Sequence, residues 1–258
     1  MSRICCRAHT ESSAVWWQRL ERAVLPERSL NIFTSVALKG VLERIAPEFA
    51  RSTGLSFTPT YAPAGVIVRR MREGATADAL VVTPETWPVL VAEGHGAAGT
   101  ERNVASSVIG VAVRVGARRP DISTPEAFRQ ALIDAKSVAY TDPSTGAASG
   151  VHFMALLERF GIADAVKAKG VLGDGGPVAE YVAQGRAEIA IQQLCEHRLI
   201  AGVDVVGPLP AELNKTTTFT AGVAAHAASP KQATALVALL GAPHVQRLLP
   251  AHGLSAVE

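Results

Sequence analysis

A short apolar run in the middle of the chain gives way to hydroxyl and glycine residues before a helical pattern begins, and this order restricts the fold more than any other feature. The segment reads SVAYTDPSTGAASGVH over residues 137–152 and predicts a strand, a turn and a helix. Gly146 and Gly150 let backbone N–H groups approach a ligand, and the positive end of a helix favours an anion. Three hydroxyl residues could donate further hydrogen bonds: Ser144, Thr145 and Ser149. The alternative is a helix start that one of these hydroxyls merely caps.

The same succession of strand, turn and helix occurs twice more in the first third of the chain. Strands are predicted at 29–33 and 55–61, and the turns at Thr34-Ser35 and Pro63-Ala-Gly65 each open a helix. Such alternation with short connections indicates an α/β fold of mostly parallel sheets with helices on both faces. Ligands of such sheets bind beyond the carboxyl ends of the strands, so we expect the three turns to meet at one site.

The remaining elements continue this alternation. Further strands are predicted at 79–82, 106–115, 166–172, 187–191, 203–206 and 216–225, and helices at 126–135, 151–160 and 178–184 and from Pro230 and Pro243. Two amides, Gln192 and Gln193, follow the strand at 187–191 at its carboxyl end. The expected division is discontinuous, with 29–108 and 211–258 in one lobe, 109–210 in the other, and residues 1–28 as an appendage.

Composition excludes several classes of protein. The 258 residues are 48% hydrophobic and 19% charged, as in ordinary globular proteins. The net charge of +2 and the absence of Lys or Arg runs longer than a pair argue against nucleic acid as a partner. No window approaches the roughly 18 apolar residues of a membrane span, so membrane insertion is not expected.

Neither a metal nor a cofactor is expected. The seven histidines are scattered, the three cysteines match no metal-site spacing and cannot form a disulfide framework, and no phosphate-loop or dinucleotide glycine pattern occurs. Residues 1–28 carry eight charged side chains and therefore lack the apolar core of about 7–15 residues that a secretory signal uses. The sequence as written predicts a cytoplasmic protein, and a periplasmic one if the start is misassigned.

Over residues 29–255 the chain resembles the type II periplasmic binding proteins, and within them the molybdate-binding component of ABC importers. Four stretches carry the resemblance: FTSVALKG at 33–40, GATAD at 74–78, YTDPSTG at 140–146 and VAQGRAEIA at 182–190. The resemblance implies two α/β lobes joined by crossing strands, with a small anion held in the cleft between them. It also implies an importer permease as a partner if the protein is exported.

The chain departs from the molybdate binders at the anion turns. Ala37 and Ala64 stand where that family has serines, and Ile191-Gln-Gln193 replaces the segment with a ligating tyrosine. The backbone N–H groups can remain, but two hydroxyl donors are missing, so we expect molybdate to bind weakly at best. Other stretches are similar to a branch of the fold that includes aconitate isomerase and binds polycarboxylates: RPDISTPE at 119–126, AKSVAY at 135–140 and VGPLP at 206–210.

Two functions remain open from the sequence. The first is a substrate-binding protein that holds an oxyanion or organic carboxylate between its lobes, with a guanidinium at Arg69 available to pair with a carboxylate. The second is a cofactor-independent isomerase that shifts a double bond in a polycarboxylic acid, which needs a base and an acid, and for which His152 and Glu196 are candidates. The expected ligand-binding residues are Ser35, Ala37, Gly65, Arg69, Ser144, Thr145, Ser149, Gln192 and Gln193.

Overall fold

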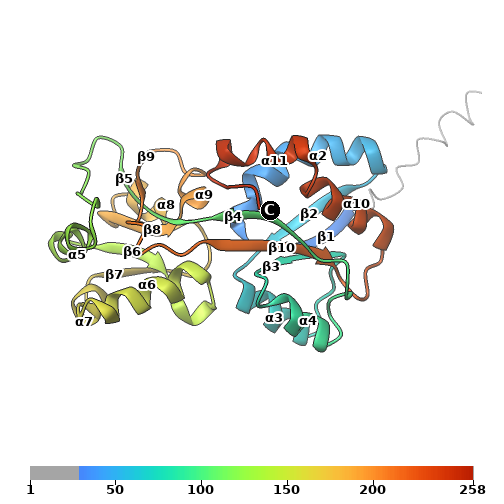
Figure 1. Cartoon of the computed structure of the whole chain (residues 1–258), viewed down its shortest axis with the longest axis horizontal. Helices are drawn as coiled ribbons and strands as arrows, with labels where there is room; N and C mark the ends of the chain where they lie inside the picture. Colours follow the sequence, from blue (N-terminus) through green and yellow to red (C-terminus); the bar gives the residue numbers. More distant parts are fainter. Residues whose placement is uncertain (1–28, 258) are drawn as a thin grey trace, which may run out of the picture.

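The computed structural model describes residues 29–257, which form two α/β lobes side by side along the long axis of the molecule (Figure 1). Each lobe is built on a five-stranded sheet, and crossing segments of the chain join the lobes (Figure 1). The appendage predicted at 1–28 lies outside the described residues. The α/β class predicted from the alternating pattern is therefore confirmed.

The sheet of the first lobe has the strand order β2-β1-β3-β10-β4. Its strands are β1 (Ser29–Thr34), β2 (Ser56–Tyr61), β3 (Ala79–Val82), β4 (Arg102–Ser107) and β10 (Thr217–Val223). β1 pairs in parallel with β2 and β3, whereas β10 pairs antiparallel with β3 and β4. Four strands thus share one direction, and the strand that returns from the second lobe opposes them.

The sheet of the second lobe repeats this plan in the order β7-β6-β8-β5-β9. Its strands are β5 (Ile109–Arg114), β6 (Val138–Thr141), β7 (Gly170–Gly173), β8 (Ile189–Gln193) and β9 (Val203–Pro208). β6 pairs in parallel with β7 and β8, and β5, the strand that enters from the first lobe, runs antiparallel to β8 and β9. Both sheets are therefore mixed but mostly parallel, as predicted.

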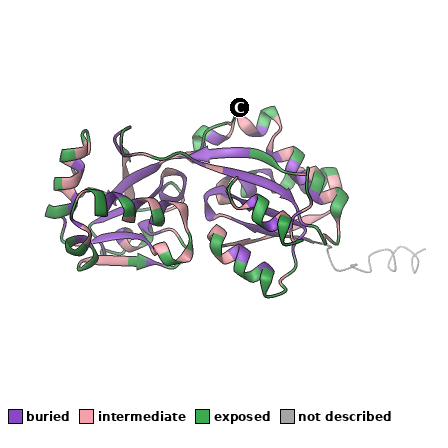
Figure 2. Cartoon of the chain, turned by 60° about the horizontal axis from the view of Figure 1, so that its bottom comes forward, coloured by how far each residue is buried: buried purple, intermediate pink, exposed green. Residues whose placement is uncertain are grey.

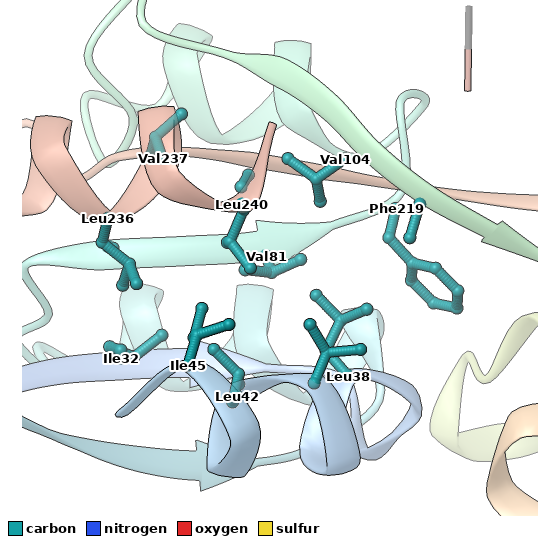
Figure 3. Packing of buried hydrophobic residues seen from close by; sticks show 14 of the residues in the cluster. Ile32, Leu38, Leu42, Ile45, Val81, Val104, Phe219, Leu236, Val237 and Leu240 are labelled. Carbon is teal, nitrogen blue, oxygen red and sulfur yellow. The ribbon is translucent and has the colours of Figure 1, made fainter. Parts of the chain in front are cut away.

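Alternating side chains bury both faces of the first sheet. Ile32 and Val81 point to the face covered by α2 (Lys39–Thr53) and α10 (Pro230–Leu240), and Figure 3 shows them packed with leucines of these helices. Leu80 and Val82 point to the opposite face, which α3 (Ala64–Arg72) and α4 (Trp87–Ala92) cover. Burial of both faces explains why these strands are continuous apolar runs.

The second sheet is covered in the same way. On one face Val111 and Val113 pack with α5 (Pro125–Asp134), α6 (Ala148–Arg159) and α7 (Ala163–Lys167). On the other face α8 (Ala179–Ala183) packs on three small residues, Ala112, Ala139 and Ala190. Figure 2 shows the strands largely buried and the outer helices alternately buried and exposed. None of the helices described over residues 29–257 is long and apolar enough to cross a bilayer.

Short helical elements complete the chain. These are η1 (Val36–Leu38), η2 (Pro143–Thr145), α9 (Leu194–His197), α11 (Pro243–Gln246) and η3 (Leu249–His252). The helices predicted from Pro230 and Pro243 are confirmed, with proline in the first turn of each.

The single strand predicted at 106–115 is wrong, because the chain changes sheet at Val108. β4 ends at Ser107 in the first lobe and β5 begins at Ile109 in the second. Asn214 takes the place of a strand partner at this point: the Ile109 N–H donates to its Oδ1 at 2.9 Å, and its Nδ2 donates to the Ile109 carbonyl at 2.9 Å. The two crossing segments are thus tied to each other between the lobes.

The strand predicted at 166–172 is also wrong in its first half. Val166 belongs to helix α7, and it packs in the core with Ile162, four residues earlier. The strand β7 starts only at Gly170. The prediction joined the end of a helix and the start of the next strand into one strand, because both place apolar residues in one short stretch.

Candidate functional site

A small chamber lies between the two lobes, beyond the carboxyl ends of β1, β3, β6 and β8. The space open to the centres of water-sized molecules is about 50 Å³. Polar residues that line it are Ser35, Thr83, Thr141, Ser149, Gln192, Gln193, Glu196 and Thr217, and apolar ones include Val36, Ala62, Pro63, Ala64, Val81, Val82, Ala147, Ala148 and Phe219. The chamber lies where ligands of such sheets are expected.

The first turns of two helices adjoin the chamber from opposite lobes. In α3 the first N–H bonded within the helix is that of Ile67, and in α6 it is that of Val151, which donates to Ala147 O. The N–H groups before these residues therefore have no intrahelical partner. Ala64 and Ala148, which begin the two helices, both line the chamber. The helices α3 and α6 have nine and twelve residues, and the positive N-terminal ends of both thus adjoin one small space.

Three hydroxyl groups are oriented by hydrogen bonds that they accept. Ser35 Oγ accepts from the Ala37 N–H at 3.2 Å, and Thr141 Oγ1 accepts from Gln192 Nε2 at 3.1 Å. Thr217 Oγ1 accepts from Gln193 Nε2 at 2.8 Å. Because each oxygen already has a donor, each hydroxyl proton is available to a ligand. Together they form a set of neutral donors suited to an anion.

The two neighbouring amides have different roles. Gln192 is used inside the second lobe: its Oε1 accepts from the Val178 N–H at 2.8 Å, and its Nε2 donates to Thr141 Oγ1 and to Gly176 O. Gln193 reaches across the cleft to Thr217 of the first lobe, and its buried Oε1 has no hydrogen-bond partner. Gln192 therefore positions a donor, whereas Gln193 has an acceptor left for a ligand.

Glu196 is the one ionisable residue among the described residues that line the chamber. It is 6% exposed, and its Oε2 has no hydrogen-bond partner. Burial raises the pKa of Glu196 to about 8, because the ionised form loses its hydration. The carboxyl group is therefore mostly protonated at neutral pH and can itself donate a hydrogen bond.

The neighbours of Glu196 in α9 anchor it to both lobes. Cys195 packs in the core of the first lobe, and His197 Nε2 donates to Gly110 O of the second lobe at 3.1 Å. Burial lowers the pKa of His197 to about 4, so its ring is neutral. Burial also raises the pKa of the Cys195 thiol, which is not a reactive thiolate. Neither neighbour brings a charge to the chamber.

The two lobes touch at the rim of the chamber. A Cβ atom placed on Gly65 would lie 2.9 Å from Thr145 O and 3.3 Å from Gly146 Cα. At a second point, a Cβ on Gly175 would lie 2.8 Å from Pro63 Cδ. The absence of side chains at these positions lets the rims approach closely. The structure thus represents the closed arrangement of the lobes.

The structure brings four of the predicted ligand-binding residues together around the chamber: Ser35, Ser149, Gln192 and Gln193. Glu196, a catalytic candidate, is with them. Thr145 and Gly65 form the rim instead, and Thr145 Oγ1 donates to Asp142 O within its own turn. Ser144 is exposed, and its N–H donates to the Asp142 side chain, which caps η2. The residues that face the chamber are therefore 147–149, at the start of α6.

Three other predicted residues lie away from the chamber. Ala37 is buried in the first lobe, and its N–H already donates to Ser35 Oγ. Arg69 is exposed on α3. His152 Nε2 donates to Leu213 O at 2.7 Å, and His152 lines a separate outer hollow of about 680 Å³ that shares Ala64, Ala148 and Thr217 with the chamber.

Among the lining residues that sequence reasoning missed are Thr83, Thr141, Thr217 and Phe219. Thr83 follows β3 directly and Thr141 ends β6, so the rule that places ligands at carboxyl ends of strands could have found both. Thr217 and Phe219 belong to the crossing strand β10. No local pattern in the sequence shows that this strand passes the cleft.

Comparison with known proteins places the chain in a family. The profile of the bacterial extracellular solute-binding proteins matches residues 30–255. The chain belongs to this family. An aconitate isomerase from Pseudomonas sp is 31% identical over 241 residues, which cover 91% of this chain and 90% of that protein.

Solved structures agree on the fold. The periplasmic molybdate-binding protein of Azotobacter vinelandii superimposes with a TM-score of 0.74 at 19% identity, covering 89% of this chain and 100% of that one. A sulfate-binding protein of Mycobacterium tuberculosis superimposes with a TM-score of 0.71 at 17% identity, covering 89% of this chain and 87% of that one. The predicted resemblance to the type II periplasmic binding proteins, including the molybdate binders, is thus confirmed.

Proposed function

We propose that this solute-binding protein holds a small organic carboxylate in the chamber between its lobes. The observation that carries the proposal is a set of hydrogen-bond donors around the chamber that includes no Lys or Arg among the described residues that line it. Two helix starts and the hydroxyls of Ser35, Thr141 and Thr217 are directed to one space. Such donors bind anions through hydrogen bonds that each contribute roughly 1.5–3 kcal/mol when one partner is charged.

The protonation of Glu196 fits an anionic ligand. An ionised carboxylate beside a bound carboxylate in a buried site would be strongly repulsive. The pKa of about 8 keeps Glu196 neutral near pH 7, and a neutral carboxyl group donates to an anion rather than repelling it. Binding of an anion raises this pKa further, so binding weakens as the pH rises above that value.

The apolar part of the lining favours an organic acid over a simple oxyanion. Apolar residues, of which Phe219 is the largest, line the chamber beside the polar ones and offer contacts to hydrocarbon rather than to oxygen. Two outer hollows, of about 680 and 410 Å³, adjoin the chamber and leave room for a longer acid to extend. Sulfate and molybdate have no hydrocarbon part to use these surfaces.

A calorimetric screen tests the proposal. Mono-, di- and tricarboxylates are titrated into the protein beside molybdate, tungstate and sulfate at about neutral pH. We expect at least one carboxylate to bind more tightly than every oxyanion, and a ligand at about 100 times its Kd to raise stability by about 2.7 kcal/mol. Submicromolar binding of molybdate with no binding of carboxylates would refute it.

Isomerisation of an unsaturated polycarboxylic acid is a second candidate function. Glu196 favours it, because the ionised form of a carboxyl group with a pKa of about 8 is a stronger base than an ordinary carboxylate: it can take a proton from carbon and, once protonated, return it to the other end of the allylic system. The relative named aconitate isomerase supports the same chemistry. No redox change and no cofactor is needed, since one C–H bond breaks and another forms while the double bond moves.

Proton exchange separates the two functions. The protein is incubated with trans-aconitate in deuterated water and the acid is followed by NMR. Deuterium incorporation or formation of the cis isomer, lost in Glu196→Gln and kept in His152→Gln, would establish the isomerase. An unchanged acid that nevertheless binds and stabilises the protein would favour the binding function, for which an ABC importer permease is the partner and export is required.

A further inference from the structure

Two buried oxygen atoms, on side chains of residues that line the chamber, have no hydrogen-bond partner. They are Gln193 Oε1 and Glu196 Oε2, on side chains that are 3% and 6% exposed. Buried polar atoms in folded proteins are nearly always paired, with protein or with a bound molecule. Two unpaired oxygens in one small chamber therefore indicate what kind of group a ligand places there.

The direction of the Gln193 amide leaves an acceptor, not a donor, in the chamber. Its Nε2 donates to Thr217 Oγ1 at 2.8 Å, a contact between β8 of the second lobe and β10 of the first. Gln193 lines the chamber, and its Oε1 atom is left without a partner. A ligand that consists of acceptors alone, such as sulfate or a plain carboxylate, cannot pair with it.

We propose, on the basis of the carboxylate binding proposed above, that the ligand is a hydroxy acid whose hydroxyl group lies between Gln193 and Glu196. A hydroxyl group can donate its proton to Gln193 Oε1 and accept one from the protonated carboxyl group of Glu196. Both unpaired oxygens then have partners. The carboxylate of the same acid binds the helix starts and the hydroxyls of Ser35 and Thr141.

The size of the chamber agrees with such a head group. A water molecule needs roughly 10–15 Å³ of this kind of space, and the chamber offers about 50 Å³. It therefore admits about as many groups as a carboxylate and one hydroxyl contain. The rest of a longer hydroxy acid extends into an outer hollow that adjoins the chamber at Ala64, Ala148 and Thr217.

Matched pairs of acids test the proposal, because each pair differs only in the hydroxyl group. Lactate is compared with propionate, and malate with succinate, as both enantiomers, by calorimetry. The hydroxy acid of at least one pair is expected to bind about tenfold tighter or more, which corresponds to about 1.4 kcal/mol. Equal binding within both pairs would overturn the hydroxy-acid proposal and leave carboxylate binding intact.

Other outcomes are equally distinct. If the amide is turned round, its NH₂ group faces the ligand, and succinate binds at least as well as malate, which overturns the proposal. Tighter binding of alanine than of lactate would also overturn it, since an ammonium group would then be the preferred donor. If no carboxylate binds at all, the proposed function itself fails.

Two variants locate the hydroxyl group. Gln193→Met keeps the size of the side chain and removes the acceptor, so it should abolish the preference for the hydroxy acid while propionate or succinate still binds. Gln246→Met is the matched control, because Gln246 also has a buried unpaired Oε1 but its Nε2 bonds Val104 O and Leu240 O in the first lobe. This control should keep the preference.

A third variant covers the case in which Gln193→Met does not fold. Thr217→Val removes the oxygen that anchors the Gln193 amide and keeps the shape of the side chain. The amide is then free to present its NH₂ group to the ligand, so the preference for the hydroxy acid should fall. An unchanged preference in Gln193→Met, or in Thr217→Val where Gln193→Met does not fold, would overturn the assignment.

Discussion

At the scale of the residue, the protonation of Glu196 links the chamber to pH. Its folded pKa of about 8 lies above the ordinary value of 4.5, so the folded protein binds this proton more tightly than the unfolded chain. The contribution of Glu196 to the free energy of unfolding is therefore fully present below pH 4.5 and is lost as the pH rises towards 8. His197 acts in the opposite sense, since its pKa falls from 6.5 to about 4 and stability is lost as the pH falls through that range.

These opposed effects make the range from pH 6.5 to 8 the informative one for Glu196. We expect the free energy of unfolding, from urea titrations, to fall across this range at up to about 1.4 kcal/mol per pH unit. Glu196→Gln keeps the shape and hydrogen-bonding groups but cannot ionise, so its stability should be nearly flat there. Glu158→Gln, on the exposed side of α6, is the control and should keep the original slope. An equal slope in all three proteins would contradict the buried, protonated state.

The burial of Glu196 could not have been predicted from its local sequence. Cys195-Glu-His-Arg198 has the appearance of a solvated helix face, because three of its four residues are polar. The structure buries Cys195, Glu196 and His197 because α9 has only four residues and lies between the two lobes. Long-range packing, not local pattern, decides the state of this group.

At the scale of the element, the start of α6 is held against the strand that precedes it. A Cβ atom on Gly150 would overlap the backbone oxygen of Thr141, a contact that a rigid strand cannot relieve. Only glycine lets the helix start approach the end of β6, and that approach places the N–H groups at the chamber. Gly150 was predicted to allow a close approach of a ligand to the backbone. In the structure it allows the close approach of another backbone segment, the end of β6.

Gly150→Ala should therefore displace the helix start and weaken the site. We expect a loss of stability of about 2 kcal/mol or more, as for other overpacked sites, and a loss of carboxylate binding, measured by urea unfolding and calorimetry. Gly176→Ala is the matched control, because a Cβ there meets no atom within 4 Å and the residue has no positive φ. Equal effects of the two substitutions would show that the close approach at Gly150 is unimportant.

The elements show which parts of the fold the sequence determines. The strands near 29–33, 55–61 and 79–82 were predicted within a residue or two, since apolar runs bounded by turn residues are strong local indicators. The three turns do meet at one site, but the chamber-facing residues of the third are 147–149 rather than 144–145. The offset arises because Asp142 caps η2 and consumes the first donors of the turn.

At the scale of the whole molecule, the chain passes between lobes where few local patterns exist. The change of sheet at Val108 has no clear marker in the sequence, since residues 104–113 are mostly apolar and the two serines before Val108 are compatible with a continuous strand. Asn214 holds the crossing, and β10 brings Thr217 and Phe219 to the chamber from the far end of the sequence. The contact of Asn214 with Ile109 joins residues 105 positions apart, which a single sequence does not reveal.

Closure of the lobes over a ligand leads to a last prediction, at Gly65. Gly65 faces Thr145 O and Gly146 Cα of the other lobe across the rim, so an added methyl group would lie 2.9 Å from a backbone oxygen. Unlike Gly150, it is exposed, and the contact is made between lobes rather than within one. The substitution Gly65→Ala should leave each lobe folded and hinder only their closure.

We therefore expect Gly65→Ala to change thermal stability little without ligand, and to weaken carboxylate binding by about tenfold, or about 1.4 kcal/mol. Small-angle scattering with saturating ligand should show a larger radius of gyration for the variant than for the parent protein. Gly176→Ala again serves as the control, because it adds the same methyl group in open space. If Gly65→Ala binds as tightly and becomes as compact as the parent protein, contact at this rim is not part of ligand capture, and the bound lobes must rest less closely together than the structure shows.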